Sequence, residues 1–248
     1  MSGHSHYATI KRQKETKDAQ KGKLFSKLSK EIAIAVREGG GTDSLANYKL
    51  RMAMDRARAS NMPKENVDRI ISKAKESGEK LESFSYEGFG PGGVSVIVEV
   101  ASDNRNRTGQ ELKNLFERAG GSLTGPGSVS FNFEHKGLIL LEKEANTEKQ
   151  FFKLIDAGVE EIEETRDGIE AYVAPERLVE IKVFLEKSAF KVKSFELVQK
   201  AKNLVSVNES ALAAKILAFL ESLEDQEDVQ KVFANLNIPD EILSKLNV

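Results

Sequence analysis

The chain of 248 residues has no cysteine and only three histidines. The lack of cysteine excludes disulfide bonds, thiolate metal sites and a cysteine nucleophile. Long hydrophobic runs are also missing, because the longest apolar stretch, residues 211–220, is too short to span a bilayer and contains Lys215. Residues 1–14 are polar and basic, without the apolar run of a secretory signal. We therefore expect a cytoplasmic protein that does not contact a membrane.

Motifs for catalysis and metal binding are equally scarce. His4 and His6 lie near the start and His135 stands alone, and none has serine and carboxylate neighbours arranged as a triad. Ser2-Gly3-His4 could hold Cu(II) or Ni(II) once Met1 is removed, but such termini arise easily and we interpret it as a coincidence. The glycine-rich residues 88–93 lead into a strand and predict turns rather than a nucleotide site. We expect no enzyme activity, no cofactor, no metal and no small-molecule substrate.

Charge is unevenly distributed along the chain. The net charge is only −2, but residues 1–80 hold 18 lysines and arginines against 10 acidic residues, and the remainder holds 19 against 29. Such asymmetry favours contact between the first part of the chain and a polyanion. A helical domain with many solvated lysines has the same balance, so the placement of the charges has to decide.

Three amphipathic helices are predicted within residues 1–80, which we expect to form a basic helical domain. The first helix covers residues 24–37 and ends at Gly39, Gly40 and Gly41, and Pro63 lies in the first turn of the third. Short helices of this kind bury their apolar stripes against one another. At helical spacing, the stripes are Phe25, Leu28, Ile32, Ala35 and Val36; Leu50, Ala53, Met54 and Ala57; and Val67, Ile70, Ile71 and Ala74.

After residue 80, strand patterns alternate with helix patterns. Residues 138–198 predict the order β-α-β-β-α-β, which is that of a ferredoxin-like unit. The flanking residues predict a second such unit, with strands at 94–100, 129–133, 204–207 and 228–236. We therefore expect an α+β protein in which an N-terminal three-helix domain precedes two ferredoxin-like domains, one inserted in the other. The predicted domains are 1–80, the discontinuous 81–135 with 199–248, and the inserted 136–198.

The most informative feature is a basic strip at the start of the helical domain. On the first helix the lysines and Arg37 lie opposite the apolar stripe, and more lysines precede it. Side chains of this kind neutralise the phosphates of a nucleic acid without reading its sequence. An ordinary solvated helix face is the alternative, and it is weakened because Glu15, Asp18 and Glu31 are the only acids before residue 38. The strip consists of Lys11, Arg12, Lys14, Lys17, Lys21, Lys23, Lys27, Lys30 and Arg37.

Two further clusters extend the candidate site. Arg51 and Arg58 share a face of the second helix, where they either widen the basic surface or only aid solubility, and Asp55 is placed to neutralise one of them. The loop 102–108 contains Arg105 and Arg107 just before a helix for which Thr108 is a plausible cap. Guanidinium groups beside free backbone amides form an anion site. The alternative is that the arginines pair with Glu87 or Asp103 and pin the loop.

A series of short motifs occurs in order from Ser2 to the end of the chain. They are Gly3-His4-Ser5, Ile10-Lys11, Asp18-Ala19-Gln20-Lys21-Gly22-Lys23, Phe25-Ser26-Lys27-Leu28, Asn61-Met62-Pro63-Lys64, Tyr86-Glu87-Gly88, Gly90-Pro91-Gly92-Gly93, Asp103-Asn104-Arg105-Asn106-Arg107-Thr108, Gly127-Ser128-Val129 and Asp228-Val229-Gln230. In these motifs the chain resembles the YebC/PmpR family. Tyr7 departs from the pattern, since the family commonly has tryptophan there, but an aromatic residue is retained.

The resemblance implies a basic helical domain followed by two ferredoxin-like domains, in a bacterial and cytoplasmic protein. Members of the family are described as probable DNA-binding transcriptional regulators. The family also includes the mitochondrial translational activator of cytochrome c oxidase subunit I, and bacterial relatives are linked to relief of ribosomes stalled on proline-rich stretches. The resemblance thus implies a nucleic-acid partner, either DNA or ribosomal or transfer RNA with the ribosome.

Three functions compete at this point. The first is duplex DNA binding that regulates transcription, and the second is RNA or ribosome binding that assists translation. The third, a hydrolase that uses the glycine loops, is the weakest. No helix carries the cluster of Asn, Gln and Arg that reads base edges, which argues against strong sequence specificity on DNA. Glycine-rich loops and an Asn-Arg loop suit irregular RNA.

Overall fold

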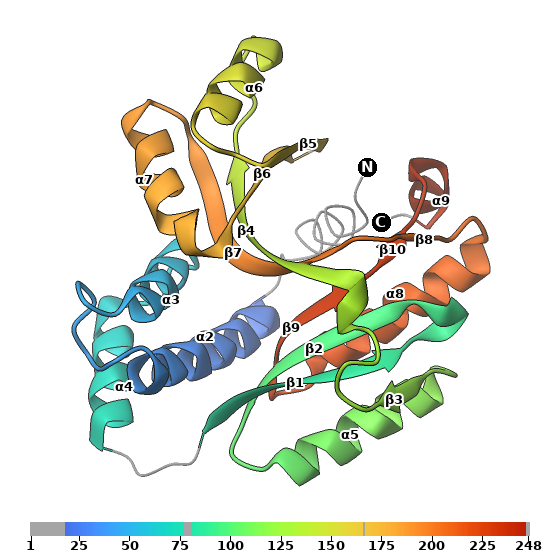
Figure 1. Cartoon of the computed structure of the whole chain (residues 1–248). Coiled ribbons are helices and arrows are strands. Elements are labelled where there is room, and N and C mark those ends of the chain that lie inside the picture. Colours follow the sequence, from blue (N-terminus) through green and yellow to red (C-terminus); the bar gives the residue numbers. More distant parts are fainter. Residues whose placement is uncertain (1–17, 77–80, 166, 247–248) are drawn as a thin grey trace. The chain divides into compact units, whose positions relative to one another are not determined.

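A computed structural model of the chain describes residues 18–76, 81–165 and 167–246 (Figure 1). The chain divides into two compact units. The first unit contains Glu15–Ser128 and Ala214–Val232, and the second contains Val129–Ala213 and Phe233–Val248. Three helices are followed by antiparallel sheets, which confirms the predicted α+β class. The predicted domain boundaries stay a prediction.

The three N-terminal helices pack on one apolar core, as their stripes predict. They are α2 (Asp18–Glu38), α3 (Tyr48–Ala59) and α4 (Lys64–Glu76). Leu28, Ile32 and Leu50 are buried in this core together with Ala53 and Val67. Helix α2 begins at Asp18 rather than at the predicted residue 24, so Lys21 and Lys23 belong to the helix and do not precede it.

A buried asparagine joins the end of α2 to the start of α3. The Asn47 side chain accepts a hydrogen bond from the Leu50 amide at 3.0 Å and so caps α3. Its Nδ2 group donates to the carbonyl oxygens of Ala35 and Gly41, both at 2.7 Å. One side chain therefore provides hydrogen-bond partners for two carbonyl oxygens at or just after the end of α2 and for one amide at the start of α3.

The first sheet lies in the first unit, and its strand order is β3-β1-β2-β9. Strands β1 and β2 form an antiparallel hairpin that runs from the pair Glu82↔Ser102 to the pair Phe89↔Ser95. β3 pairs antiparallel with the other edge of β1. The strands are β1 (Glu82–Phe89), β2 (Ser95–Ser102), β3 (Ser122–Thr124) and β9 (Val229–Ala234).

Two helices cover one face of this sheet, α5 (Arg105–Arg118) and α8 (Ser210–Asp225) (Figure 1). Phe116 of α5 and Phe219 of α8 meet edge to face, with ring centroids 4.9 Å apart. The sheet approaches these rings at glycines: a Cβ atom on Gly88 would lie 2.5 Å from the Phe116 ring, and one on Gly90 would lie 2.8 Å from the Phe219 ring. The close packing of the two helices on the sheet therefore depends on Gly88 and Gly90, which have no side chain.

The second unit contains a sheet with the strand order β5-β6-β4-β7. Along the chain its elements follow the predicted order β-α-β-β-α-β of a ferredoxin-like unit. All adjacent strands in it are antiparallel. The elements are β4 (Phe133–Leu141), α6 (Thr147–Asp156), β5 (Glu161–Thr165), β6 (Gly168–Val173), α7 (Leu178–Lys187) and β7 (Val192–Ala201).

The strands of the two sheets have the same arrangement in space, but they follow one another along the chain in a different order. In the first sheet β1 takes the position that β6 has in the second, although β1 comes first along the chain. The sequence does not predict β1, because Gly88 interrupts its alternation of apolar and polar residues. The predicted unit therefore contains other strands instead of β1. The predicted strand at 129–133 is wrong, because residues 130–132 form a 3₁₀ turn. The predicted strand at 204–207 is present at residues 205–206, but it pairs in a separate two-stranded parallel sheet rather than in the first sheet.

The remaining elements are short. No helix among the described residues is long and apolar enough to cross a membrane. The short elements are the 3₁₀ turns η1 (Pro91–Gly93), η2 (Ser130–Asn132) and η3 (Pro175–Arg177), the paired strands β8 (Val205–Ser206) and β10 (Leu236–Asn237), and the helix α9 (Asp240–Lys245).

The close approach at Gly88 is testable. Gly88→Ala should lower the free energy of unfolding by about 1–3 kcal/mol, because the new methyl group overlaps Phe116 and the Ser122 carbonyl. Chemical denaturation monitored by circular dichroism measures this. Gly125→Ala is the matched control, since a Cβ atom there would meet nothing within 4 Å. Equal stability of the two variants would contradict the packing argument.

Candidate nucleic-acid interface

The basic strip is only partly covered by the structure. Helix α2 carries five of its nine residues, Lys21, Lys23, Lys27, Lys30 and Arg37. The side chain of Lys21 lies outside the described residues. The other four strip residues, Lys11, Arg12, Lys14 and Lys17, also lie outside them.

Three strip lysines contact an acidic turn formed by residues 224–228, at the end of α8 and before β9. Lys23 Nζ lies 2.9 Å from Asp225 Oδ1, and Lys27 Nζ donates to the Glu224 carbonyl oxygen. Lys30 Nζ donates to the Glu227 carbonyl oxygen at 3.1 Å. Because these lysines lie opposite the apolar stripe, the sequence predicts that their removal barely changes stability, and this stays a prediction. The structure adds that all three have acceptors in the same unit, about 200 residues further along the chain.

The strongest of these contacts is at Asp228, whose side chain is 6 % exposed. Its Oδ1 atom lies 2.7 Å from Lys30 Nζ, and its Oδ2 atom lies 3.0 Å from Arg107 Nη2. The hydroxyl groups of Thr108 and Ser102 also donate to Oδ2, at 2.7 and 3.0 Å. The carboxylate therefore joins α2, the end of β2 and the start of α5.

These partners keep Asp228 ionised. Burial by itself raises the pKa of a carboxyl group, but hydrogen bonds from Lys30, Thr108, Arg107 and Ser102 outweigh burial and hold the pKa of Asp228 well below its ordinary value. In turn, Asp228 raises the pKa of Arg107 through a hydrogen bond and its charge. The cluster is thus a fixed ion network at physiological pH.

The loop 102–108 is built differently from the prediction. Asn104 rather than Thr108 caps α5, because its side chain accepts a hydrogen bond from the Arg107 amide at 3.1 Å. Arg107 pairs with Asp103, as one predicted alternative had it, and also with Asp228. Glu87, the other predicted partner, accepts instead from the Gly127 amide. Arg107 therefore helps to pin the loop, while 47 % of its side chain remains exposed.

The arginines of α3 are separate from this network. Arg58 is exposed and lies 3.4 Å from Asp55, the acid predicted to neutralise one of the pair. Arg51 is half-buried, and its Nε atom is buried without a hydrogen-bond partner. The structure therefore does not place Arg51 and Arg58 on one equally exposed surface.

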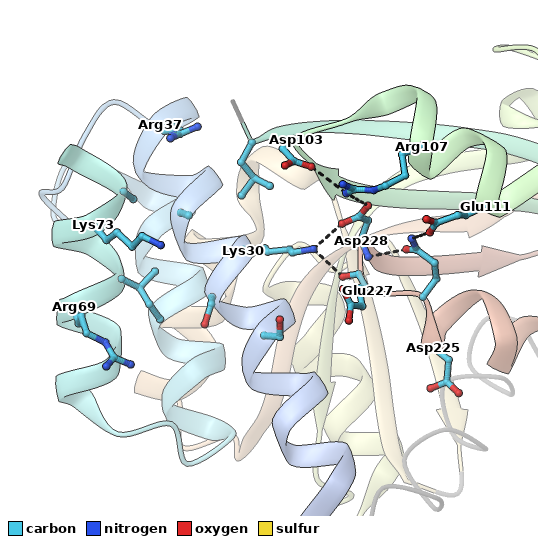
Figure 2. A pocket seen from close by; sticks show the side chains of 17 residues that line it. Lys30, Arg37, Arg69, Lys73, Asp103, Arg107, Glu111, Asp225, Glu227 and Asp228 are labelled. Carbon is cyan, nitrogen blue, oxygen red and sulfur yellow. Dashed lines mark hydrogen bonds and ion pairs between the residues drawn. The ribbon is translucent and has the colours of Figure 1, made fainter. Parts of the chain in front are cut away.

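A hollow of about 1000 Å³ in the first unit brings separate predicted clusters together. Lys30 and Arg37 of the strip and Arg107 of the loop all line it. Figure 2 shows Arg37, Arg69 and Lys73 on α2 and α4 at one side, with Asp103, Arg107 and Glu111 at the other and Lys30 reaching between them. We call Arg37, Arg69 and Lys73 the cationic wall.

Sequence reasoning missed part of this hollow. Arg69 and Lys73 have a local signal, because their spacing of four residues places them together on α4. Asp228 has no such signal, since its partners are distant in sequence. Within the described residues, no group of three or more histidine, aspartate and glutamate side chains could hold a metal ion.

Family models for two consecutive regions match nearly the whole chain. The TACO1/YebC protein N-terminal domain matches residues 5–77, and the TACO1/YebC second and third domain matches residues 81–236. The chain belongs to the TACO1/YebC family. This confirms the resemblance to the YebC/PmpR family that the motifs predict.

Relatives in the family match along their full length. A protein of Dictyoglomus thermophilum is 44% identical over 100% of both chains, and one of Thermotoga maritima is 44% identical over 99% of both. Each is named a probable transcriptional regulatory protein. The crystal structure of a conserved hypothetical protein from Aquifex aeolicus matches with a TM-score of 0.84 and 41% identity, covering 91% of this chain and 94% of that one.

Replacement of Asp228 should show how much the network contributes. Asp228→Asn should lower the free energy of unfolding by about 2–3 kcal/mol, because Lys30 and Arg107 lose a buried charged partner. Asp225→Asn is the control, since both members of the Lys23–Asp225 pair are exposed and such pairs contribute about 1 kcal/mol or less. Denaturant titration of both variants measures the difference.

The same comparison has a pH signature. Since the pKa of Asp228 is lower in the folded than in the unfolded chain, its stabilisation is present at neutral pH and is lost in acid. The difference in free energy of unfolding between wild type and Asp228→Asn should decrease as the pH falls from about 5 towards about 2. A difference that stays constant over this range would contradict the assigned ionisation.

Proposed function

We propose that this protein regulates gene expression by binding nucleic acid through its first unit. The observation that supports the proposal is the hollow, where the predicted strip and the predicted loop meet, although about 70 residues separate Arg37 from Arg107. Cations from α2, α4 and α5 converge there. The names of the relatives, probable transcriptional regulatory protein, agree with a regulator.

The cationic wall is the part of the hollow best suited to phosphate. Arg37, Arg69 and Lys73 come from two helices that share one apolar core, so their backbones are held rigidly. Guanidinium groups form paired hydrogen bonds with phosphate oxygens, and each phosphate that is neutralised releases a counterion. The acids on the opposite side, Glu111 and Glu227 among them, repel phosphate and so orient a strand along the wall.

The strip lysines have a smaller role in this proposal than the sequence predicts. Lys30 is held by Asp228, and Lys27 by a carbonyl oxygen of the acidic turn, so binding of phosphate to either would compete with an internal partner. Lys23 remains mostly exposed and contributes more readily. Lys11, Arg12, Lys14 and Lys17, together with Lys21, stay predictions.

Two kinds of nucleic acid are candidates. The names of the relatives favour DNA and transcription, and we propose DNA binding on that basis. Arg105, an exposed residue at the start of α5, lies over the ring of Phe84 on β1. Such a pair favours RNA and translation as the second candidate. Crosslinking in cells, with sequencing of both bound DNA and bound RNA, separates them. Enrichment of promoter DNA would support the first, and enrichment of ribosomal or transfer RNA the second.

We also propose that the protein acts by binding rather than by catalysis. The relatives carry names of regulatory proteins, and none of the names specifies a reaction. The absence of a cofactor, a membrane partner and a small-molecule substrate, and a cytoplasmic location, stay predictions.

The cationic wall is tested by its removal. The triple variant Arg37→Ala, Arg69→Ala and Lys73→Ala should bind duplex DNA and single-stranded RNA more weakly than wild type. The slope of log affinity against log salt should fall by about 0.9 per lost contact on duplex DNA and about 0.7 on single strands. Fluorescence polarisation of labelled oligonucleotides at several salt concentrations measures both quantities.

A charge-matched control removes three exposed lysines of the second unit, Lys149, Lys187 and Lys191. It lowers the net charge equally and should leave the salt slope close to that of wild type. If the wall variant folds and keeps the wild-type affinity and slope, the wall is not the phosphate site.

A further inference from the structure

Two aromatic side chains lie side by side on β1, next to the start of α5. Phe84 and Tyr86 are two residues apart on one strand, so they point to the same face of the sheet. Their ring centroids lie 5.6 Å apart, and the rings meet edge to face at 78°. Both residues are only half-buried, so the pair is accessible from solvent.

The start of α5 places an arginine over this pair. Tyr86 packs against Gly109, where a Cβ atom would come within 2.9 Å of the phenol oxygen. The Tyr86 hydroxyl donates to the Arg105 carbonyl oxygen at 2.5 Å and so fixes the first turn of the helix. The Arg105 guanidinium then lies 5.4 Å from the centroid of the Phe84 ring, and the residue is exposed.

The phenol keeps its proton in this arrangement. Burial raises the pKa of Tyr86 above its ordinary value and outweighs the lowering effect of the Arg105 charge. The hydroxyl therefore remains a donor at physiological pH.

We propose that Phe84 and Arg105 form a stacking platform for an unpaired base of single-stranded nucleic acid. The proposal rests on the proposed nucleic-acid function and specifies the form of ligand. Aromatic rings and guanidinium planes both stack on bases, and base–aromatic stacking is insensitive to sequence. A base inside a duplex already stacks on its neighbours, so the platform selects single strands, bulges and loops. The common chemistry is an unpaired base, which RNA and single-stranded DNA both provide.

A purely structural role is the alternative. A cation over an aromatic face also stabilises the start of a helix. The two roles differ in what a lysine can replace. Lysine keeps the charge over Phe84 but has no planar group on which a base can stack.

A tryptophan reporter tests the platform directly. The chain contains no tryptophan, so Phe84→Trp introduces a single indole that keeps an aromatic ring below Arg105. We expect its fluorescence to be quenched by single-stranded RNA or DNA of about 12 nucleotides and much less by duplex DNA. Phe152→Trp is the matched control, because Phe152 is 62% exposed and lies in the second unit. Its fluorescence should not change.

Substitution of the arginine keeps the proposal falsifiable if the tryptophan variant folds poorly. Arg105→Lys should weaken binding to single strands by roughly 5-fold or more, the lower limit for loss of one stacked base, and leave the melting temperature and duplex binding nearly unchanged. A preference for RNA over single-stranded DNA in both assays would assign the platform to RNA. Equal quenching by RNA and by single-stranded DNA would show that the platform recognises only the base.

The outcomes separate this inference from the proposed function. If polarisation shows that single strands bind while the indole of Phe84→Trp is not quenched and Arg105→Lys binds normally, the platform is wrong and the proposed function stands. If no nucleic acid binds to the wild-type chain, both are wrong. A fall in stability that accounts for the whole loss of binding in Arg105→Lys would assign Arg105 a structural role only.

Discussion

The carboxylate of Asp228 joins two segments that are far apart along the chain, α2 and residues 102–108. Lys30 on α2, Ser102 at the end of β2, and Arg107 and Thr108 on α5 all donate to it. A buried carboxylate is costly unless cations and hydrogen bonds surround it, and here four side chains do so. The carboxylate thereby ties α2 to α5, two of the helices that line the hollow.

The same network uses part of the positive charge of the first unit to stabilise the fold. Lys30 and Arg107 face Asp228 and stabilise the fold, whereas the three residues of the cationic wall lie on the other side of the hollow (Figure 2). A lysine on a polar helix face is therefore not automatically available to a ligand. Its partner elsewhere in the fold decides its role.

The two ferredoxin-like sheets differ in how far their strand order follows from contiguous residues. The β-α-β-β-α-β order of the second sheet follows from contiguous alternation over residues 138–198, and the sequence predicts it. In the first sheet β1 comes before the strand that starts the usual order, and residues 129–213 of the second unit lie between β3 and β9 along the chain. The alternation of apolar and polar residues indicates a strand, but it does not indicate which other strand pairs with it.

Local patterns in the amino-acid sequence are enough to give the apolar stripes of α2, α3 and α4, the end of α2 at its glycines, and membership of the family. These depend on the periodicity of neighbouring residues or on short motifs, and both are local. The folded chain alone reveals which cations contact Asp228, that Arg69 and Lys73 lie on the same side of the hollow as Arg37, and that Arg105 lies over Phe84. Such pairs act over a few ångströms in space but are separated by up to about 200 positions in sequence, so no local pattern records them.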